Sequence, residues 1–267
     1  MNYQLENKGS LACVGIGMTL GAHITPITKA HIRESDICFV MASDALVELW
    51  VEQMHHNVVS LQPYYASNKS RKKTYKEMVD AVLQEVRAGK KVCGIFYGHP
   101  GVFAYVPHKL ISKARLEGFK AIMEAGISAE DTLIADLGID PGKFGCQQYE
   151  ASQFMFYKRI IDPSAYLILW QIGVAGDLTY GVEVTGAKYR QILLELLYIN
   201  YPKNHSVILY EAATIAIKGI RAENIALQDL VGADIKDYTT LVIPPARNMQ
   251  RNKEVIQEIT ALSIECC

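Results

Sequence analysis

Short apolar segments alternate with segments of helical periodicity along this chain, and that alternation restricts the possible folds more than any other feature. Residues 11–16, 37–41 and 92–96 are apolar runs of strand length, and glycine or small polar residues follow each within two positions. Such runs, bounded by turn residues, predict buried strands. Further strands are expected at 58–61, 166–172, 207–210 and 241–243.

The clearest helical pattern covers residues 73–88, whose apolar side chains recur at helical spacing before Gly89 ends the segment. The repeating positions are Tyr75, Met78, Val79, Val82 and Val86. Other helices are expected around 27–32, at 108–116, from the N-cap residue Ser128 to Gly138, and at 188–198. Alternation of this kind predicts an α/β fold, and the continuous apolar strands predict sheets covered on both faces.

The length of 267 residues permits two domains of ordinary size, each with its own core. The junction is expected near residues 120–126, which divides the chain into an N-terminal domain, 1–123, and a C-terminal domain, 124–267. Both are predicted to be α/β.

Composition excludes several classes of function. The net charge of −1 provides no basic surface for nucleic acid or an anionic membrane. No apolar run approaches the roughly 20 residues that span a bilayer, and the polar first ten residues do not resemble a signal peptide. The six cysteines lack metal-ligand spacing, so no metal site and a cytoplasmic location are expected. Cys13, Cys38 and Cys93 are interpreted as buried apolar residues, and Cys266 and Cys267 as frayed thiols.

The first glycine loop, residues 15–21, follows the first predicted strand. Its glycines allow the backbone to approach a ligand, although a tight turn without a ligand explains them too. Leu20 replaces the third glycine of the dinucleotide pattern, and Asp36 and Asp44 do not stand where the ribose-binding acid is expected. A standard NAD site is therefore disfavoured.

A second loop, Tyr97 to Gly101, begins where a buried strand ends. Ligands of open α/β sheets bind at the carboxyl ends of strands. Gly98, Pro100 and Gly101 predict a rigid floor with few side chains, and Tyr97 and His99 add polar groups to it. The clustering of these residues in one loop favours a binding function over a purely structural one.

Taken in order, these segments resemble the tetrapyrrole methylase fold, and most closely the borosin-type peptide backbone α-N-methyltransferases. The resemblance extends over roughly residues 10 to 246. The matching residues are Tyr65, Lys69, Arg71, Thr74, Tyr75, 86–91, 97–103, Gly126, 128–131, 135–137, 139–141, 149–152 and 243–245. The set of tyrosines with Arg71 and the sequence Tyr149-Glu150-Ala151-Ser152 are the specific part, whereas the first glycine loop is weakly specific.

The resemblance implies two α/β domains with S-adenosyl-L-methionine in the cleft between them, S-adenosyl-L-homocysteine as product, and an intertwined homodimer. It implies a cofactor set of Tyr97, His99, Val102, Phe103, Ser128, Ala129, Gln171, Tyr210, Ala212 and Thr240. It implies a catalytic set of Tyr65, Arg71, Tyr75 and Tyr97.

Methylation of a peptide amide explains why such residues are needed. The amide nitrogen is a poor nucleophile, because its lone pair is delocalised into the carbonyl. It must lose its proton while its oxygen is stabilised. Arg71 and Tyr75 are four residues apart on one helix face, so Arg71 is expected to lower the pKa of a tyrosine base from about 10 or to hold the developing oxyanion. Tyr75 is the first choice as base, with Tyr65 and Tyr97 orienting, although packing alone also explains a tyrosine at this position.

The substrate is expected to be a separate precursor peptide, as in the split bacterial borosin enzymes, with two peptides and two enzyme chains forming a heterotetramer. Residues 246–267 are charged and carry a helical stripe, which predicts a terminal packing helix rather than a methylatable apolar peptide. Two alternatives are a methyltransferase of the same fold acting on a tetrapyrrole-like small molecule, and a catalytically silent binding partner.

Overall fold

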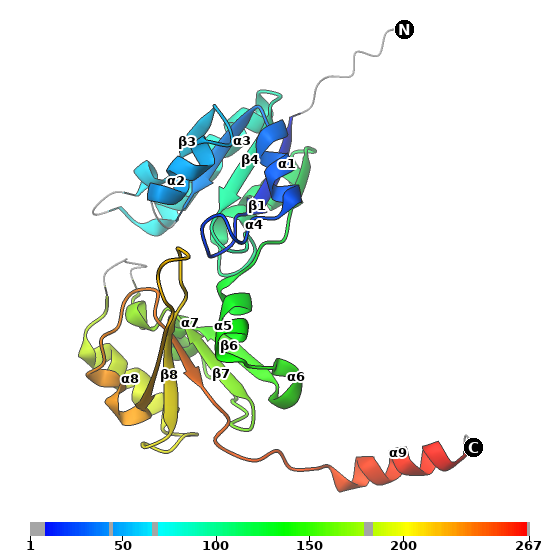
Figure 1. The fold of residues 1–267 in the computed structure, drawn as a ribbon, viewed down its shortest axis with the longest axis vertical. Coiled ribbons are helices and arrows are strands. Elements are labelled where there is room, and N and C mark those ends of the chain that lie inside the picture. The colour runs from blue at the N-terminus through cyan, green and yellow to red at the C-terminus, as the bar shows by residue number, and fades with distance from the viewer. Residues whose placement is uncertain (1–8, 43–44, 66–68, 179–183, 266–267) are drawn as a thin grey trace.

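The computed structural model describes residues 9–42, 45–65, 69–178 and 184–265, and these fold into two lobes, each built on a five-stranded sheet. Figure 1 shows the two lobes one above the other, with the last helix apart from both. Asp44, Cys266 and Cys267 lie outside the described residues. Within them, no helix is long and apolar enough to cross a membrane.

The first sheet is entirely parallel, with the strand order β3-β2-β4-β1-β5. Its strands are β1 (Ser10–Gly15), β2 (Ile37–Met41), β3 (Val58–Ser60), β4 (Lys91–Phe96) and β5 (Lys120–Met123). The strands predicted at 37–41 and 92–96 are confirmed, the second to within one residue. β5 was missed because it is short, begins with Lys120 and lies at the sheet edge.

Helices cover this sheet on both faces, as predicted. They are α1 (Pro26–Glu34), α2 (Ala45–Glu52), α3 (Arg71–Arg87) and α4 (Tyr105–Leu116). Leu11 and Cys13 of β1 share a core with α3 and α4, whereas Ala12 and Val14 share one with α1 and α2. Successive side chains of a strand point to opposite faces, so a continuous apolar run is what a sheet between two helical layers requires. Cys13, Cys38 and Cys93 are buried in these cores, as expected.

The second sheet is mixed rather than parallel. Its order is β6 (Cys146–Glu150), β7 (Tyr166–Trp170), β10 (Thr240–Ile243), β8 (Ser206–Glu211) and β9 (Arg221–Ala226). Only the pair of β6 and β7 is parallel. The strands β6 and β9 were missed because neither is an apolar run; both lie at sheet edges.

Three helices pack on the second sheet. Side chains of α7 (Ala151–Phe156) and α8 (Ala187–Leu197) share a core with Leu167 and Leu169 on one face, and α5 (Ala129–Leu137) packs with Ile168 on the other. Short helical segments complete the chain at η1 (Gln62–Tyr64), α6 (Pro141–Phe144), η2 (Ile172–Val174) and η3 (Leu227–Val231). The predicted ends of α5 are confirmed: Ser128 forms a capping box with Asp131, and Gly138 closes the helix at φ 62°.

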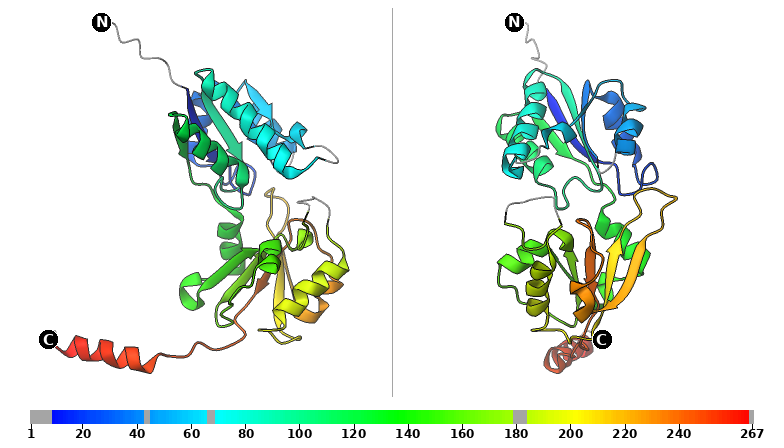
Figure 2. Two further views of the ribbon diagram at one scale, coloured as in Figure 1. Left: turned by 180° about the vertical axis from the view of Figure 1, so that it is seen from behind. Right: turned by 90° about the vertical axis from the view of Figure 1, so that its left-hand side faces the viewer.

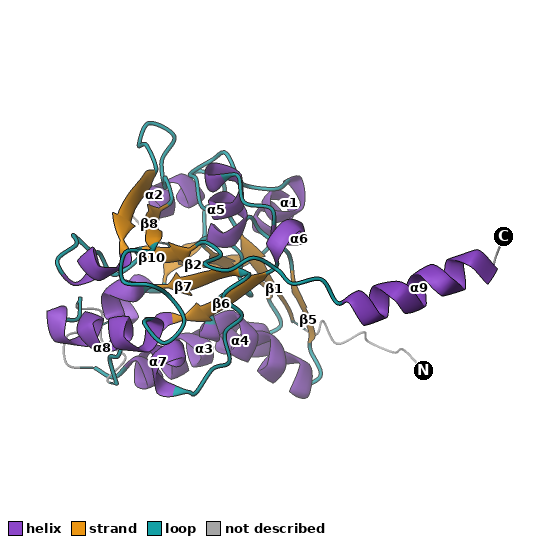
Figure 3. Cartoon of the chain, turned by 90° about the horizontal axis from the view of Figure 1, so that it is seen from below, coloured by secondary structure: helices purple, strands orange, loops and turns teal. Residues whose placement is uncertain are grey.

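The last helix, α9 (Lys253–Glu265), corrects one expectation. It was predicted to pack on its own chain, yet residues 247–262 are all exposed. The helix projects from the second lobe in Figures 1 and 3 and in the left-hand view of Figure 2. The apolar stripe of Val255, Ile256, Ile259 and Leu262 is present, but the extended segment before it carries the stripe away from both cores. Periodicity predicts that a helix forms, not which surface it meets.

Candidate active site between the two domains

The two loops singled out in the sequence meet at a topological switch point. β1 and β4 are neighbours in the sheet, yet β1 leads to α1 on one face and β4 leads to α4 on the other. The connections therefore diverge at the carboxyl ends of two adjacent strands. Open α/β sheets bind ligands in the crevice that forms there.

Glycines bring three backbone segments into contact at this point. The amide of Gly98 donates to the carbonyl of Gly17 at 2.9 Å, and the amide of Gly17 donates to the carbonyl of Gly98 at 3.2 Å. A Cβ atom on Gly15 would lie 2.3 Å from the Gly98 oxygen, and one on Gly126 would lie 2.5 Å from it. The expectation that the first loop opens its glycines toward a ligand is thus corrected for Gly15, which packs against backbone. Gly15 and Gly126 bring the loops together, and we call this group of four the glycine junction.

His99 has a defined hydrogen-bonding role. Its Nδ1 accepts from the backbone amide of Gly101 at 2.8 Å. An accepting Nδ1 in a neutral imidazole places the proton on Nε2, which is then a donor for a ligand. His99 is half-buried, so this donor sits at the wall of the site rather than in bulk solvent.

The second domain forms the other wall. Phe103 and Gln171 are the two residues other than glycine with positive φ in the described chain, at 49° and 57°. Such backbone is disfavoured for side chains with a Cβ and is concentrated at functional sites. The Phe103 ring lies 5.7 Å from that of Trp170, the last residue of β7, and Gln171 follows directly. The contact of Phe103 with Trp170 therefore joins the two domains, and Gln171 lies next to it in the sequence.

A second contact joins the domains beside the first glycine loop. The amide of Leu20 donates to the carbonyl of Thr214 at 2.9 Å, and the hydroxyl of Thr19 donates to the carbonyl of Ala213 at 2.9 Å. The acceptors follow directly after Ala212, a predicted cofactor residue, at the end of β8. Residue 212 is thus fixed close to the switch point.

The structure limits what three predicted cofactor residues can contribute. Ser128 is buried, and its hydroxyl is engaged with Asp131 in the capping box. Tyr210 is buried, and its hydroxyl donates to the Asp136 carboxylate at 2.7 Å. Thr240 is buried opposite Tyr210 in the sheet. The hydroxyl groups of Ser128 and Tyr210 are thus engaged within the protein, and the Thr240 side chain is buried in the sheet. Val102 and Ala129 are half-buried close to the loops.

The four predicted catalytic residues come from three segments at the carboxyl edge of the first sheet. Tyr65 follows η1, Arg71 and Tyr75 occupy the first two turns of α3, and Tyr97 follows β4. The rings of Tyr65 and Tyr75 meet edge to face with centroids 6.4 Å apart. The backbone amide of Tyr97 bonds to Met41 of β2, and the Tyr65 hydroxyl lies 3.9 Å from the sulfur of the same methionine. We call these four residues the tyrosine–arginine cluster.

The electrostatics of this cluster separate its tyrosines. Desolvation, and then the neighbouring Tyr75, raise the pKa of Tyr65 well above its ordinary value, against an opposing effect of Arg71. Desolvation also raises the pKa of Tyr97, with contributions from Tyr75 and from Asp237 of the second domain. The charge of Arg71 acts to lower the pKa of both tyrosines, but desolvation outweighs it. Neither Tyr65 nor Tyr97 is therefore prepared to act as a base.

Arg71 has an unused donor. Its Nε atom is buried and has no hydrogen-bond partner among the residues that the structure describes. A buried polar atom without a partner costs stability, and most such atoms in proteins are paired. An N–H group held out of water at this position is suited to an oxygen that develops negative charge.

Sequence reasoning missed Tyr105, the first residue of α4. Its ring stacks on that of Tyr75, with centroids 5.7 Å apart and an interplanar angle of 24°. The available signal was its place directly after residues 97–103. Trp170 was missed as well, because it reads as an ordinary apolar strand residue. No cluster of potential metal ligands occurs within the described part of the chain.

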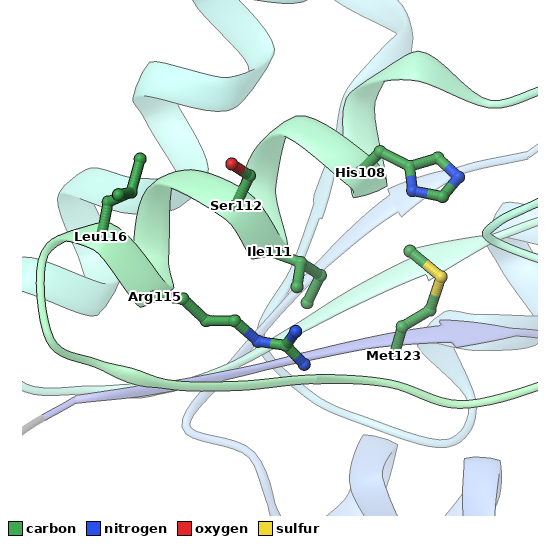
Figure 4. A pocket seen from close by; sticks show the side chains of 6 residues that line it. All are labelled: His108, Ile111, Ser112, Arg115, Leu116 and Met123. Atoms are coloured by element: carbon green, nitrogen blue, oxygen red, sulfur yellow. The ribbon is translucent and has the colours of Figure 1, made fainter.

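A separate hollow of about 580 Å³ lies on the outer side of the first domain (Figure 4). It is lined by His108, Ile111, Ser112, Arg115 and Leu116 of α4 and by Met123 of β5. None of these belongs to the predicted sets. His108 connects the hollow to the second loop, since its Nε2 lies 2.9 Å from the carbonyl oxygen of Gly101.

Comparison with known families identifies the fold. The family model of the tetrapyrrole (corrin/porphyrin) methylases matches residues 10–226, which include both glycine-containing loops and nine of the ten strands. The chain belongs to the tetrapyrrole methylase family. Its two sheets and the switch point between β1 and β4 are therefore the tetrapyrrole methylase fold, as the resemblance predicted.

Curated relatives of this family member include proteins from Gymnopus fusipes and Gymnopilus junonius. One, from Gymnopus fusipes, is described as a methyltransferase and ribosomally synthesized precursor of cyclic gymnopeptides. It is 35% identical over 266 residues, and the match covers 97% of this chain and 63% of the relative. One from Gymnopilus junonius, a methyltransferase and type I borosin cyclic peptide precursor, is 37% identical over 244 residues, or 89% of this chain and 57% of the relative. The chain thus spans about three fifths of the length of these relatives, whose names combine methyltransferase and precursor in one protein.

Among solved structures, the uroporphyrin-III-C-methyltransferase of Thermus thermophilus is similar to this chain, with a TM-score of 0.60. The similarity covers 89% of this chain and 93% of the other, at 17% sequence identity. At that identity the similarity concerns the fold alone.

Proposed function

We propose that this protein is an S-adenosylmethionine-dependent methyltransferase that modifies backbone amide nitrogens of a ribosomally made precursor peptide, in successive rounds on one peptide. The observation that carries the proposal is the tyrosine–arginine cluster, with the buried, unpartnered Nε of Arg71 beside three tyrosines. Such a group offers proton acceptors and an oxyanion donor together, which amide methylation needs and which transfer to a better nucleophile does not. The names of the curated relatives support the same substrate class.

The residues at the cleft fit the proposed cofactor. His99 Nε2 and the exposed Gln171 side chain are hydrogen-bonding groups suited to the polar portions of S-adenosylmethionine. Phe103, with 54% of its surface exposed, offers an aromatic face of the kind that attracts a cationic centre such as a sulfonium. When bound, the cofactor supplies an electrophilic methyl group on that sulfonium.

The chain's own residues would prepare the amide. Tyr75 is the proposed base: its phenolic oxygen would accept the proton of the amide nitrogen, and the electron pair left on nitrogen would be available to the methyl group as the cofactor's sulfur takes back the electrons of the methyl–sulfur bond. Arg71 donates a hydrogen bond from Nε to the carbonyl oxygen as negative charge builds there. In other enzymes, removal of one such oxyanion donor lowers the rate by about 10²–10³. Tyr65 and Tyr97 remain protonated and orient the amide by donating hydrogen bonds.

We further propose that the peptide is supplied by a separate chain, and that two enzyme chains and two peptides form a heterotetramer. In the relatives the precursor is part of the same protein, so this arrangement differs from theirs. Residues 247–262 are exposed, carry charged side chains and contain no apolar run of the kind proposed as substrate, so this segment is not itself the proposed substrate.

Mass spectrometry tests both statements. The purified chain is incubated with S-adenosylmethionine and an apolar synthetic peptide of precursor type, and fragmentation of the product locates each added methyl group. Methyl groups on backbone nitrogens of the added peptide support the proposal. An unchanged peptide together with a heavier enzyme chain would instead mean that the chain modifies itself.

A tetrapyrrole-like ring is the second candidate substrate. The exposed rings of Tyr65, Tyr97, Phe103 and Tyr105 would also stack on a planar macrocycle, and the fold is shared with a uroporphyrin methyltransferase. Incubation with a uroporphyrinogen under the same conditions decides between the two. Turnover of the ring with no turnover of any peptide would replace the first proposal by this one.

A further inference from the structure

Tyr105 lies next to the tyrosine–arginine cluster, although neither the resemblance nor the proposed chemistry assigns it a role. It is the first residue of α4, eight residues after Tyr97 on the same connection. Of its surface, 57% is exposed.

Tyr105 is one of two aromatic residues that contact the ring of Tyr75. One side of the Tyr75 ring meets the edge of Tyr65 at an interplanar angle of 88°, and a second side is stacked on Tyr105 at 24°. Tyr75 also packs on the core beneath α3. A phenol held by a perpendicular ring on one side and a parallel ring on the other has a single direction for its hydroxyl.

We propose that Tyr105 is a positioning residue that fixes the direction of the Tyr75 phenol beside Arg71. The inference rests on the proposed function, because it concerns the residue assigned there as the base. The stack uses the aromatic ring of Tyr105 and not its hydroxyl. The stack also links Tyr75 on α3 to the connection between β4 and α4, which carries Tyr97 and His99. The proposed base and the residues on the cofactor side are therefore aligned by the same connection.

The position allows a clean experiment, because a side chain that is more than half exposed contributes little to the core. Tyr105→Ala is expected to fold and to lower kcat roughly tenfold through misplacement of the base, with the KM for peptide and the affinity for S-adenosylhomocysteine unchanged within about twofold. Tyr105→Phe keeps the stack and is expected to retain wild-type kcat. Leu116→Ala, at the exposed far end of the same helix, is the matched control and should change nothing.

A double-mutant cycle provides the decisive comparison. In a Tyr75→Phe background the phenolic oxygen is gone, so Tyr105→Ala is expected to cause no further loss of the residual single-turnover rate. An equal tenfold loss in that background would overturn the inference. So would a Tyr105→Phe variant as slow as Tyr105→Ala, or a Tyr105→Ala variant at the wild-type rate.

A spectroscopic measurement separates this inference from the proposed function. With 3-fluorotyrosine at position 75, the ¹⁹F resonance is expected to shift or broaden in Tyr105→Ala and to stay in place in Tyr105→Phe. If no peptide is methylated but the resonance behaves in this way, the proposed function fails while the positioning role stands. If the resonance is the same in all variants, the positioning role is overturned whatever the substrate.

Discussion

The two sheets of this protein are equal in strand number but opposite in construction. The first is parallel throughout, is covered by helices on both faces, and places β1 and β4 side by side at a switch point. The second is mixed, with antiparallel pairs from β7 to β9, and it offers strand ends rather than a switch point. The first domain therefore carries the side chains proposed as catalytic at the carboxyl edge of its sheet, whereas the second supplies the opposing wall through Trp170, Gln171 and residues 212–214.

The largest expected effect tests whether the chemistry belongs to the first domain. Arg71→Ala should lower kcat by about 10²–10³, because it removes the buried donor at Nε. Calorimetric titration with S-adenosylhomocysteine should give an unchanged affinity, since the cofactor site is assigned to other residues. Lys72→Ala, an exposed neighbour on α3, is the control. A kcat for Arg71→Ala within a few-fold of the wild type would remove Arg71 from the mechanism.

The glycine junction provides the next test. Gly15→Ala places a methyl group 2.3 Å from a backbone oxygen that cannot move independently, so we expect a loss of about 1–3 kcal/mol in the free energy of unfolding. Urea denaturation followed by circular dichroism measures it. Gly219→Ala, where a Cβ would meet nothing within 4 Å, should leave the free energy unchanged. Equal midpoints for both variants would mean that the three loops are not packed as described.

A smaller effect is expected at the domain boundary. Phe103→Ala removes a ring that is 54% exposed and contacts Trp170, so stability should be nearly unchanged while the Kd for S-adenosylhomocysteine rises about five- to tenfold. Calorimetric titration gives the Kd directly. Tyr157→Ala, a similarly exposed aromatic in the second domain, serves as the control. An unchanged Kd in Phe103→Ala would show that the two domains do not share the cofactor at this ring.

The smallest effect concerns the core of the second domain alone. Tyr201 is buried with its hydroxyl unpartnered among the described residues, and burial raises its pKa from 10.0 to about 12. The folded state thus keeps this proton where the unfolded state loses it, so stability should fall as the pH rises from about 10 to about 12. Tyr201→Phe should reduce that alkaline loss and, near neutral pH, stabilise the chain by up to about 1 kcal/mol. Thermal unfolding at several pH values measures both, and an alkaline loss as steep in Tyr201→Phe as in the wild type would contradict the assignment.

The fold of the first domain was more predictable than that of the second, because the two sheets are covered differently. In the first sheet every central strand is an apolar run, because helices cover both faces, and residues 37–41 were predicted without error. In the second sheet the edge strands β6 and β9 carry polar and charged residues, and neither was predicted. Strand direction was not predictable either, since antiparallel pairing of β10 with β7 and β8 depends on contacts far apart in the chain.

The site shows the same division. Arg71 and Tyr75 were paired from their spacing, because residues four apart on a helix share a face. The stack of Tyr105 on Tyr75 joins two helices and left no trace in the spacing. The hydrogen bonds of Ser128 and Tyr210 within the protein and the burial of Thr240 also emerged only from their surroundings.

By itself, the sequence determined the α/β class, the helix ends at Ser128 and Gly138, the two glycine-containing loops and the position of Arg71 and Tyr75 four residues apart on one helix, because these depend on periodicity and on local backbone preferences. Only the tertiary structure decided that Gly15 serves backbone packing, that desolvation outweighs Arg71 at Tyr65 and Tyr97, and that α9 stands clear of both cores. Burial and close approach are properties of segments distant in sequence, so no local pattern encodes them.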